Sequence, residues 1–272
     1  MKLMKLKIDW DSNNTKLLIA IIIIWIILAI IFGFTDLEIS KALVNRESLW
    51  ANIGKDYGEA PGYGIIAVAI SILIGSYQDE LKKQKIAAYV FLMSGAFIII
   101  LAIIVGSIWF MAFGGGITLG VLLFLIFTHN RDWREFKKIA IVIILLSIIN
   151  PLIFVQIGKI LCGRVRYNDL SSDYSNYTPW FLPPGPISWL QGNASFPSGH
   201  TALAFVSLPL IIEIKENNWN IVLKLSTIFI ILSYAFFIAI SRVIVGDHYA
   251  SDVLFSIGVA VVVTILLYKK FY

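Results

Sequence analysis

The chain has 272 residues, of which 58% are hydrophobic and only 14% charged, and its formal net charge is +5. A soluble domain carries roughly a quarter charged residues, so this composition excludes an ordinary soluble protein. The basic residues lie mostly in short segments beside long apolar runs, which indicates membrane orientation and not a nucleic-acid surface. The single cysteine, Cys162, excludes an internal disulfide and a cysteine-based metal cluster.

The apolar runs predict an all-α, polytopic bundle of transmembrane helices. About 20 apolar residues in a helix cross the hydrocarbon core of a bilayer, where the backbone must bond to itself. The first apolar run, 17–34, is longer than the hydrophobic core of a signal peptide, and no small-residue cleavage site follows Phe34. We therefore interpret this run as a membrane span. The uncharged runs are 17–34, 60–77, 86–128, 139–158, about 199–212, 225–241 and 253–268.

The run 86–128 is long enough for two spans. Gly114, Gly115 and Gly116 predict the break between them, because glycine is a poor helix former and permits a tight turn. The expected count is then eight spans. The alternative is seven spans, with one of the short segments re-entrant.

The basic residues predict the orientation. If the N-terminus is cytoplasmic and eight spans alternate, both termini are cytoplasmic, and the inner segments hold 15 of the 22 Lys and Arg residues. This asymmetry fits the rule that basic loops stay in the cytoplasm. Since no internal repeat or low-complexity linker divides the chain, we expect one membrane-embedded domain over residues 1–272.

Two outer segments are longer than the others. In 35–59, Ile39, Leu43 and Trp50 at helical spacing among charges suggest a short amphipathic helix at the interface, and an irregular loop is the alternative. Segment 167–196 is rich in turn residues and interfacial aromatics. It is either a lid over a site or a packed surface loop.

The first stretch with chemical interest runs from Lys159 to Arg166 at the end of a predicted span. The two cations are seven residues apart, about two helical turns, so they share a face if the helix continues. They could clamp a phosphate, because Arg offers a planar fork and Lys a point charge. On this stretch alone, a pair of interfacial anchors is the simpler interpretation.

The second stretch is Pro197-Ser-Gly-His200, directly before an apolar run. Ser198 is a candidate helix N-cap, and Gly199 lets the backbone approach a ligand closely. Free N–H groups at a helix N-terminus form an anion site, beside which His200 would project. An ordinary cap with a structural histidine is the alternative.

The third stretch is Ser241-Arg-Val-Ile-Val-Gly-Asp-His-Tyr-Ala-Ser-Asp252. His248 and Asp252 are at i and i+4, so on a helix their side chains can meet. A carboxylate on one ring nitrogen fixes the tautomer and leaves the other nitrogen as a nucleophile or base. Arg242 adds a third cation. A salt-linked histidine at a helix start is the weaker alternative, because ionisable residues beside a span are costly.

Together these stretches are more specific than any one of them. The chain resembles the type-2 phosphatidic acid phosphatase superfamily, whose three motifs are written KX6RP, PSGH and SRX5HX3D. The second and third motifs match in full, and Tyr167 stands where the first usually has proline. The motif region covers 159–252. Six core spans are usual in that family, so about eight spans imply extra N-terminal ones.

The resemblance implies roles for these residues. His248 would attack phosphorus, Asp252 would orient it, and His200 would protonate the leaving oxygen and then activate water. The phosphoryl oxygens would be held by Lys159, Arg166, Ser198, Gly199 and Arg242. No metal or other cofactor is expected, because three cations can stabilise the charge and no carboxylate cluster for Mg²⁺ is visible.

The expected protein is therefore a cell-membrane phosphatase. Its substrate would be an amphiphilic lipid phosphate or isoprenoid diphosphate such as undecaprenyl diphosphate, dephosphorylated through a phosphohistidine on the extracytoplasmic face. A lipid phosphotransferase with the same residues is one alternative, and a non-catalytic transporter of anionic lipids is another. The bilayer and the lipid substrate are the expected partners. The sequence leaves the oligomeric state open.

Overall fold

The computed structural model describes residues 13–216 and 219–272, and every regular element in those residues is a helix. The elements are α1 (Asn13–Leu43), α2 (Leu49–Tyr57), α3 (Ala60–Gly75), α4 (Leu81–Gln84), α5 (Ile86–Val105), α6 (Ile108–Thr128), η1 (Trp133–Phe136), α7 (Lys137–Ser147), η2 (Ile148–Phe154), α8 (Val155–Cys162), η3 (Tyr167–Asp169), α9 (Pro186–Leu190), α10 (Gly199–Ala204), η4 (Phe205–Ser207), α11 (Leu210–Glu216), α12 (Ile221–Ile244) and α13 (Ala250–Phe271).

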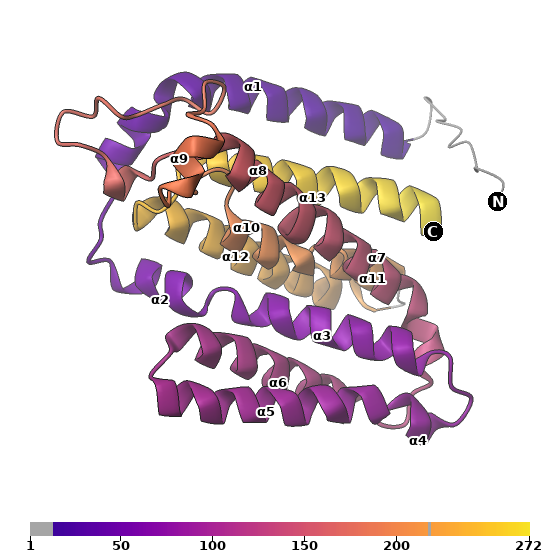
Figure 1. Ribbon diagram of the computed structural model, residues 1–272. Coiled ribbons are helices and arrows are strands. Elements are labelled where there is room, and N and C mark those ends of the chain that lie inside the picture. Colours follow the sequence, from indigo (N-terminus) through magenta and orange to yellow (C-terminus); the bar gives the residue numbers. More distant parts are fainter. Residues whose placement is uncertain (1–12, 217–218) are drawn as a thin grey trace.

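The long helices run side by side in one elongated bundle (Figure 1). Helix α1 packs along α13, α3 contacts both α6 and α7, and α5 covers the far side of α6. The start of α1 and the end of α13 lie at the same end of the bundle, where Lys269 Nζ donates to Thr15 Oγ1 at 2.5 Å. The all-helical, polytopic prediction is therefore confirmed.

Seven helical segments in the described part of the chain are long and apolar enough to cross a membrane. They are Thr15–Leu43, Leu49–Gly75, Leu81–Val105, Ile108–Thr128, Trp133–Asp169, Ile221–Ile244 and Ala250–Phe271. The expected span at 199–212 is instead divided into α10, η4 and α11. The last interruption is at Pro209, directly before α11. Proline has no backbone N–H to continue the hydrogen bonds of a preceding helix. The total number of spans and the orientation of the termini stay predictions.

The predicted break at Gly114–Gly116 is wrong. The chain turns at Gly106, which adopts a left-handed φ of 68°, and Ser107 then caps α6 by accepting from the Phe110 N–H. The three glycines lie inside α6, where Gly116 makes a close helix contact: a Cβ there would lie 2.0 Å from the Ala60 carbonyl oxygen. Glycine serves close packing here, as small residues do between membrane helices.

Segment 35–59 holds parts of two helices. Helix α1 continues through Ile39 to Leu43, and Trp50 belongs to the short α2, so the three residues expected on one amphipathic helix are divided. The buried face of α2 is made by Ala51 and Gly54. This short helix leads directly into α3.

The chain from Lys137 to Cys162 is nearly continuous, but its middle is a π-helix. Pro151 lies inside this wider turn, which accommodates a residue that cannot donate a backbone hydrogen bond. The buried Asn150 side chain donates to the Ser256 carbonyl of α13 at 3.1 Å, which ties this turn to the bundle. The π-helix contributes Ile148, Pro151 and Leu152 to a cavity described below.

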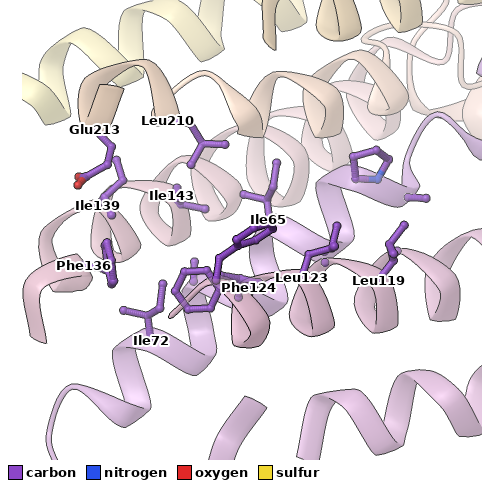
Figure 2. A pocket seen from close by; sticks show the side chains of 18 of the residues that line it. Ile65, Ile72, Leu119, Leu123, Phe124, Phe136, Ile139, Ile143, Leu210 and Glu213 are labelled. Atoms are coloured by element: carbon purple, nitrogen blue, oxygen red, sulfur yellow. The ribbon is translucent and has the colours of Figure 1, made fainter. Parts of the chain in front are cut away.

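A separate cavity of about 630 Å³ lies between α3, α6, α7 and α11. Figure 2 shows its side chains, which are apolar in composition apart from Glu213 at one end. None of the residues with predicted chemical roles lines it. The larger cavity is therefore not the candidate catalytic site.

Candidate active site

A cavity of about 550 Å³ lies on the other side of α3 and has a polar and an apolar part. The polar part gathers ionisable side chains from α3, α8, α10 and α12 and from the loops after α8 and α12. The apolar part lies between α3, α7 and the π-helix. The lining residues are Glu59, Tyr63, Ile66, Ile70, Ile144, Ser147, Ile148, Pro151, Leu152, Gln156, Lys159, Arg166, Gly199, His200, Leu203, Arg242 and His248.

Six residues singled out from the sequence line this one cavity: Lys159, Arg166, Gly199, His200, Arg242 and His248. The other two, Ser198 and Asp252, are fully buried and do not line it. Ser198 caps α10, with its Oγ accepting from the Thr201 hydroxyl at 3.0 Å. The structure thus brings the three motifs together, and the catalytic roles of their residues stay predictions.

Lys159 and Arg166 both line the cavity, but they do not extend from one helix. Helix α8 ends at Cys162, and Gly163 follows with a left-handed φ of 54°, so the two cations do not share a helix face. A side chain at position 163 would also clash, because its Cβ would lie 2.2 Å from the Gly185 carbonyl oxygen. The turn at Gly163 bends the chain so that Arg166 comes to the cavity from the following loop.

The Arg242 guanidinium is buried and only partly paired. Its Nη2 donates to Asp247 Oδ2 at 2.5 Å, whereas its Nε and Nη1 have no hydrogen-bond partner among the described residues. The Nε of Arg166 is likewise buried without a described partner. Buried donors are nearly always satisfied, so two only partly paired guanidinium groups that line the same cavity indicate a site for an anion.

His248 is almost fully buried and is fixed through one ring nitrogen. Its Nδ1 lies 2.5 Å from the Ser195 carbonyl oxygen, and a carbonyl can only accept, so Nδ1 carries the proton and donates it. The neutral ring then has its lone pair on Nε2. Burial lowers the pKa of His248 to about 4, so the ring is neutral at pH 7.

The expected contact of His248 with Asp252 is longer than a hydrogen bond. Helix α13 begins at Ala250, so the two residues do not lie on one helix, and His248 Nδ1 is 3.8 Å from Asp252 Oδ2. Asp252 Oδ2 instead accepts from the Ser195 hydroxyl at 2.5 Å and from the Tyr249 N–H at 2.9 Å. Ser195, which the sequence analysis did not identify, therefore contacts both Asp252 and His248.

Arg164 joins this carboxylate to the N-terminal helix. Its guanidinium is fully buried and donates to Asp252 Oδ1 at 2.7 Å and to Asp36 Oδ2 of α1 at 3.0 Å. The same group donates to the Ser251 hydroxyl and, through Nε, to the Thr178 carbonyl, each at 2.9 Å. Arg164 lies within the first motif, and this position was the only feature of the sequence that pointed to the buried network.

His200 contacts two oxygens at the opening of the cavity. Its Nδ1 lies 3.1 Å from Glu59 Oε1, and its Nε2 lies 3.0 Å from the Lys55 carbonyl oxygen. The sequence analysis did not single out Glu59, and no motif surrounds it. Only the fold brings the first turn of α3 beside the second motif.

Segment 167–196 packs against α1 and over the buried network. Trp180 Nε1 donates to the Ala29 carbonyl of α1 at 2.9 Å, and the Tyr177 ring contacts the Tyr249 ring. All residues of this segment are described, and none of them lines the cavity. Of the two interpretations, the packed surface loop fits the structure.

In the part of the chain that the structure describes, no group of three or more His, Cys, Asp or Glu side chains could hold a metal ion. The polar part of the cavity is basic, so it suits a phosphate better than a metal cation. Whether the reaction needs a metal stays a prediction.

The fold and the cavity describe a helical protein with several candidate membrane spans and a basic, histidine-lined cavity. The model of the PAP2 superfamily matches residues 140–272, which confirms the resemblance noted from the motifs. Its members are phosphatases, which supports phosphoesterase activity in general. No curated protein and no solved structure matches the chain.

Proposed function

We propose that the protein is a membrane phosphatase that removes phosphate from lipid phosphates or isoprenoid diphosphates through a phosphohistidine on His248. One observation carries this proposal: Arg166 and Arg242, which have unpaired guanidinium donors, and both histidines line one cavity whose other part is apolar. Such a cavity suits a phosphate joined to a hydrocarbon tail.

In the proposed first step, Nε2 of His248 attacks phosphorus while Nδ1 stays bonded to the Ser195 carbonyl. The N–P bond forms as the P–O bond to the leaving group breaks, and His200 protonates the leaving oxygen. Lys159, Arg166 and Arg242 would stabilise the phosphoryl oxygens, because phosphoryl transfer depends mainly on positioning and charge stabilisation.

In the second step, water attacks the phosphohistidine. Its oxygen bonds to phosphorus, the N–P bond breaks, and a proton of the water passes to the neutral His200. This returns His248 to its starting state and His200 to the protonated form. General acid–base help of this kind is worth roughly 10²- to 10⁴-fold in rate.

The apolar part of the cavity supports an amphiphilic substrate. Ile66 and Ile70 of α3 line this part together with Ile144, Ile148 and Leu152. We expect the tail to lie here while the phosphate meets the cations.

Phosphate release from a panel of substrates by the purified protein tests this proposal. The panel compares phosphatidic acid, phosphatidylglycerophosphate and undecaprenyl diphosphate with glycerol 3-phosphate, which has no tail. We expect release from the amphiphiles that EDTA leaves unchanged and vanadate blocks. Parallel reactions with an added acceptor lipid distinguish water from a lipid as the phosphoryl acceptor.

A matched pair of variants separates the site from the rest of the chain. His248→Ala should lower turnover by on the order of 10³-fold or more in a protein that still folds. His129→Ala changes an exposed histidine after α6 and should have no effect. Retained activity in His248→Ala, or strict dependence on Mg²⁺, would refute the mechanism.

A further inference from the structure

Glu59 lies in the site but outside the segment that matches the superfamily. It precedes α3, and its carboxylate is held from both sides: Tyr63 donates its hydroxyl proton to Oε2 at 2.6 Å, and His200 Nδ1 lies 3.1 Å from Oε1. Both Glu59 and Tyr63 line the cavity. The carboxylate is thus aimed at the ring to which the proposed mechanism gives the proton transfers.

The turn that carries Glu59 is fixed by its neighbours. Tyr234 of α12 donates to the Gly58 carbonyl at 2.9 Å. The Lys55 carbonyl belongs to the last turn of α2, where carbonyls lack a partner within the helix, and it meets His200 Nε2 at 3.0 Å. The position of the carboxylate relative to His200 is therefore determined by α2, α3 and α12 together.

The two contacts of His200 favour its doubly protonated form. A carboxylate and a backbone carbonyl are both acceptors, so both ring nitrogens donate only when the ring is an imidazolium. Burial of the ring acts most strongly against that charge, and Arg242, His248 and Lys159 also disfavour it, so that the pKa of His200 is lowered well below its usual value. The carboxylate of Glu59 is the anion that opposes them.

We propose that Glu59 is a positioning residue that holds His200 in its protonated, acid form, with Nδ1–H on the carboxylate and Nε2–H free to pass to the leaving oxygen. This inference rests on the proposed phosphatase function. Once the leaving group has taken the Nε2 proton, the Nδ1–H bond to Glu59 keeps the neutral ring oriented. Its Nε2 lone pair then faces the attacking water. The Lys55 carbonyl would hold Nε2–H only until the leaving oxygen replaces it.

The test compares two substrates that differ in their need for an acid. Dodecyl phosphate has an alcohol leaving group that must be protonated, whereas 4-nitrophenyl phosphate has a stable anionic one. Glu59→Gln should lower kcat/KM for dodecyl phosphate by roughly 10- to 100-fold and should affect 4-nitrophenyl phosphate only weakly. It should also move the basic limb of the pH profile down by about one unit.

Three further variants sharpen the test. Glu59→Asp keeps a carboxylate and should recover part of the lost activity, and Tyr63→Phe should act in the same direction as Glu59→Gln but less strongly. Glu38→Gln removes a mostly exposed carboxylate that pairs with Lys41, away from the cavity, and should behave as the wild type.

Several results would overturn the assignment of Glu59. Equal losses on both substrates would mean that the carboxylate only supports the fold. An unchanged kcat with a lower KM would mean that it only offsets the three cations. A wild-type protein with no phosphatase activity on any substrate would instead refute the proposed function itself, so the two failures are distinguishable.

Discussion

At the scale of single residues, a fixed acceptor holds the His248 ring in one tautomer. The Ser195 carbonyl fixes the proton of His248 on Nδ1, and the hydroxyl of the same residue donates to Asp252. One residue thus connects the histidine and the carboxylate, which are 3.8 Å apart. The proposed nucleophile depends on this backbone contact as much as on the carboxylate of the third motif.

The buried ring of His248 should make stability depend on pH. Its pKa is lowered to about 4 by burial, from 6.5 in the unfolded chain. Between these values the unfolded chain binds a proton that the folded protein does not, so the free energy of unfolding falls as pH falls through this window. The loss from His248 should be on the order of 2 kcal/mol.

Melting temperatures in detergent micelles at pH 7 and pH 4.5 test this effect. The wild type should lose more stability on acidification than His248→Asn, which has no group to titrate at that position. The assignment of a neutral buried ring would be contradicted if the difference in melting temperature between the two proteins were the same at both pH values. It would also be contradicted if the wild type became relatively more stable at the lower pH.

Arg164 should be among the most important residues for stability. Arg164→Met removes the cation between two buried carboxylates, Asp36 and Asp252, and leaves both without their ion-pair partner. Breaking a buried pair in this way costs about 3–5 kcal/mol. Chemical unfolding in micelles measures the loss.

The matched control for this change is Arg131→Met, which breaks an exposed contact of 3.6 Å with Glu135. An exposed pair contributes about 0–1 kcal/mol, so this variant should remain close to the wild type. Equal stability of the two variants would show that the buried network contributes little.

At the scale of helices, the site depends on how closely α3 approaches α6. Ala60, which Gly116 contacts, is the neighbour of Glu59 at the start of α3. Any side chain at position 116 would push this end of α3 away from α6 and disturb the contact with His200. The packing of glycine against backbone thereby supports the geometry of the cavity.

Two adjacent glycines offer a direct comparison. Gly116→Ala should cost about 1–3 kcal/mol and lower turnover, because its Cβ would lie 2.0 Å from the Ala60 carbonyl oxygen. Gly115→Ala meets nothing within 4 Å and should be neutral or stabilise by at most about 1 kcal/mol. Thermal melting with an activity assay measures both, and similar behaviour of the two variants would refute this role for Gly116.

The sequence predicted helices well and their ends less well. Long apolar runs determine where helices form. The turn after α5 was predicted at Gly114–Gly116, but it occurs at Gly106, which adopts a positive φ. Lys159 and Arg166 would share a helix face only if the helix continued, and α8 stops before Gly163 for the same conformational reason. A glycine in an apolar run has two uses, turning and close packing, and only the neighbouring helix decides between them.

The candidate site was predictable where residues belong to compact motifs. His200, His248 and the three cations of the motifs were identified because their spacing is specific, and they meet in one cavity. Glu59 and Asp36 were not identified, because each reaches the site from an N-terminal helix that has no local pattern. Contacts between distant segments leave no sequence signature in a single chain.

At the scale of the whole molecule, the end of α12 and the start of α13, which flank His248, lie at one end of the bundle, and the start of α1 and the end of α13 lie at the other (Figure 1). Basic residues of two predicted inner segments, those of α4 and of the last turn of α13, also lie at that second end. By the distribution of basic residues, we expect the site to face away from the cytoplasm.

Labelling with a membrane-impermeant maleimide tests this orientation. In a Cys162→Ser background, Ser172→Cys lies in the exposed loop near the site and Lys83→Cys lies at the opposite end of the bundle. The first variant should react in intact cells and the second only after permeabilisation. The reverse pattern would mean that the site faces the cytoplasm.

The most direct measurement is capture of the covalent intermediate. The purified protein is mixed with a ³²P-labelled lipid phosphate, quenched in alkali within milliseconds to seconds, and the labelled peptide is sequenced by mass spectrometry. We expect an acid-labile phosphoryl group on His248, present in the wild type and absent from His248→Ala. Label on a different residue, or turnover that continues in His248→Ala, would contradict the account.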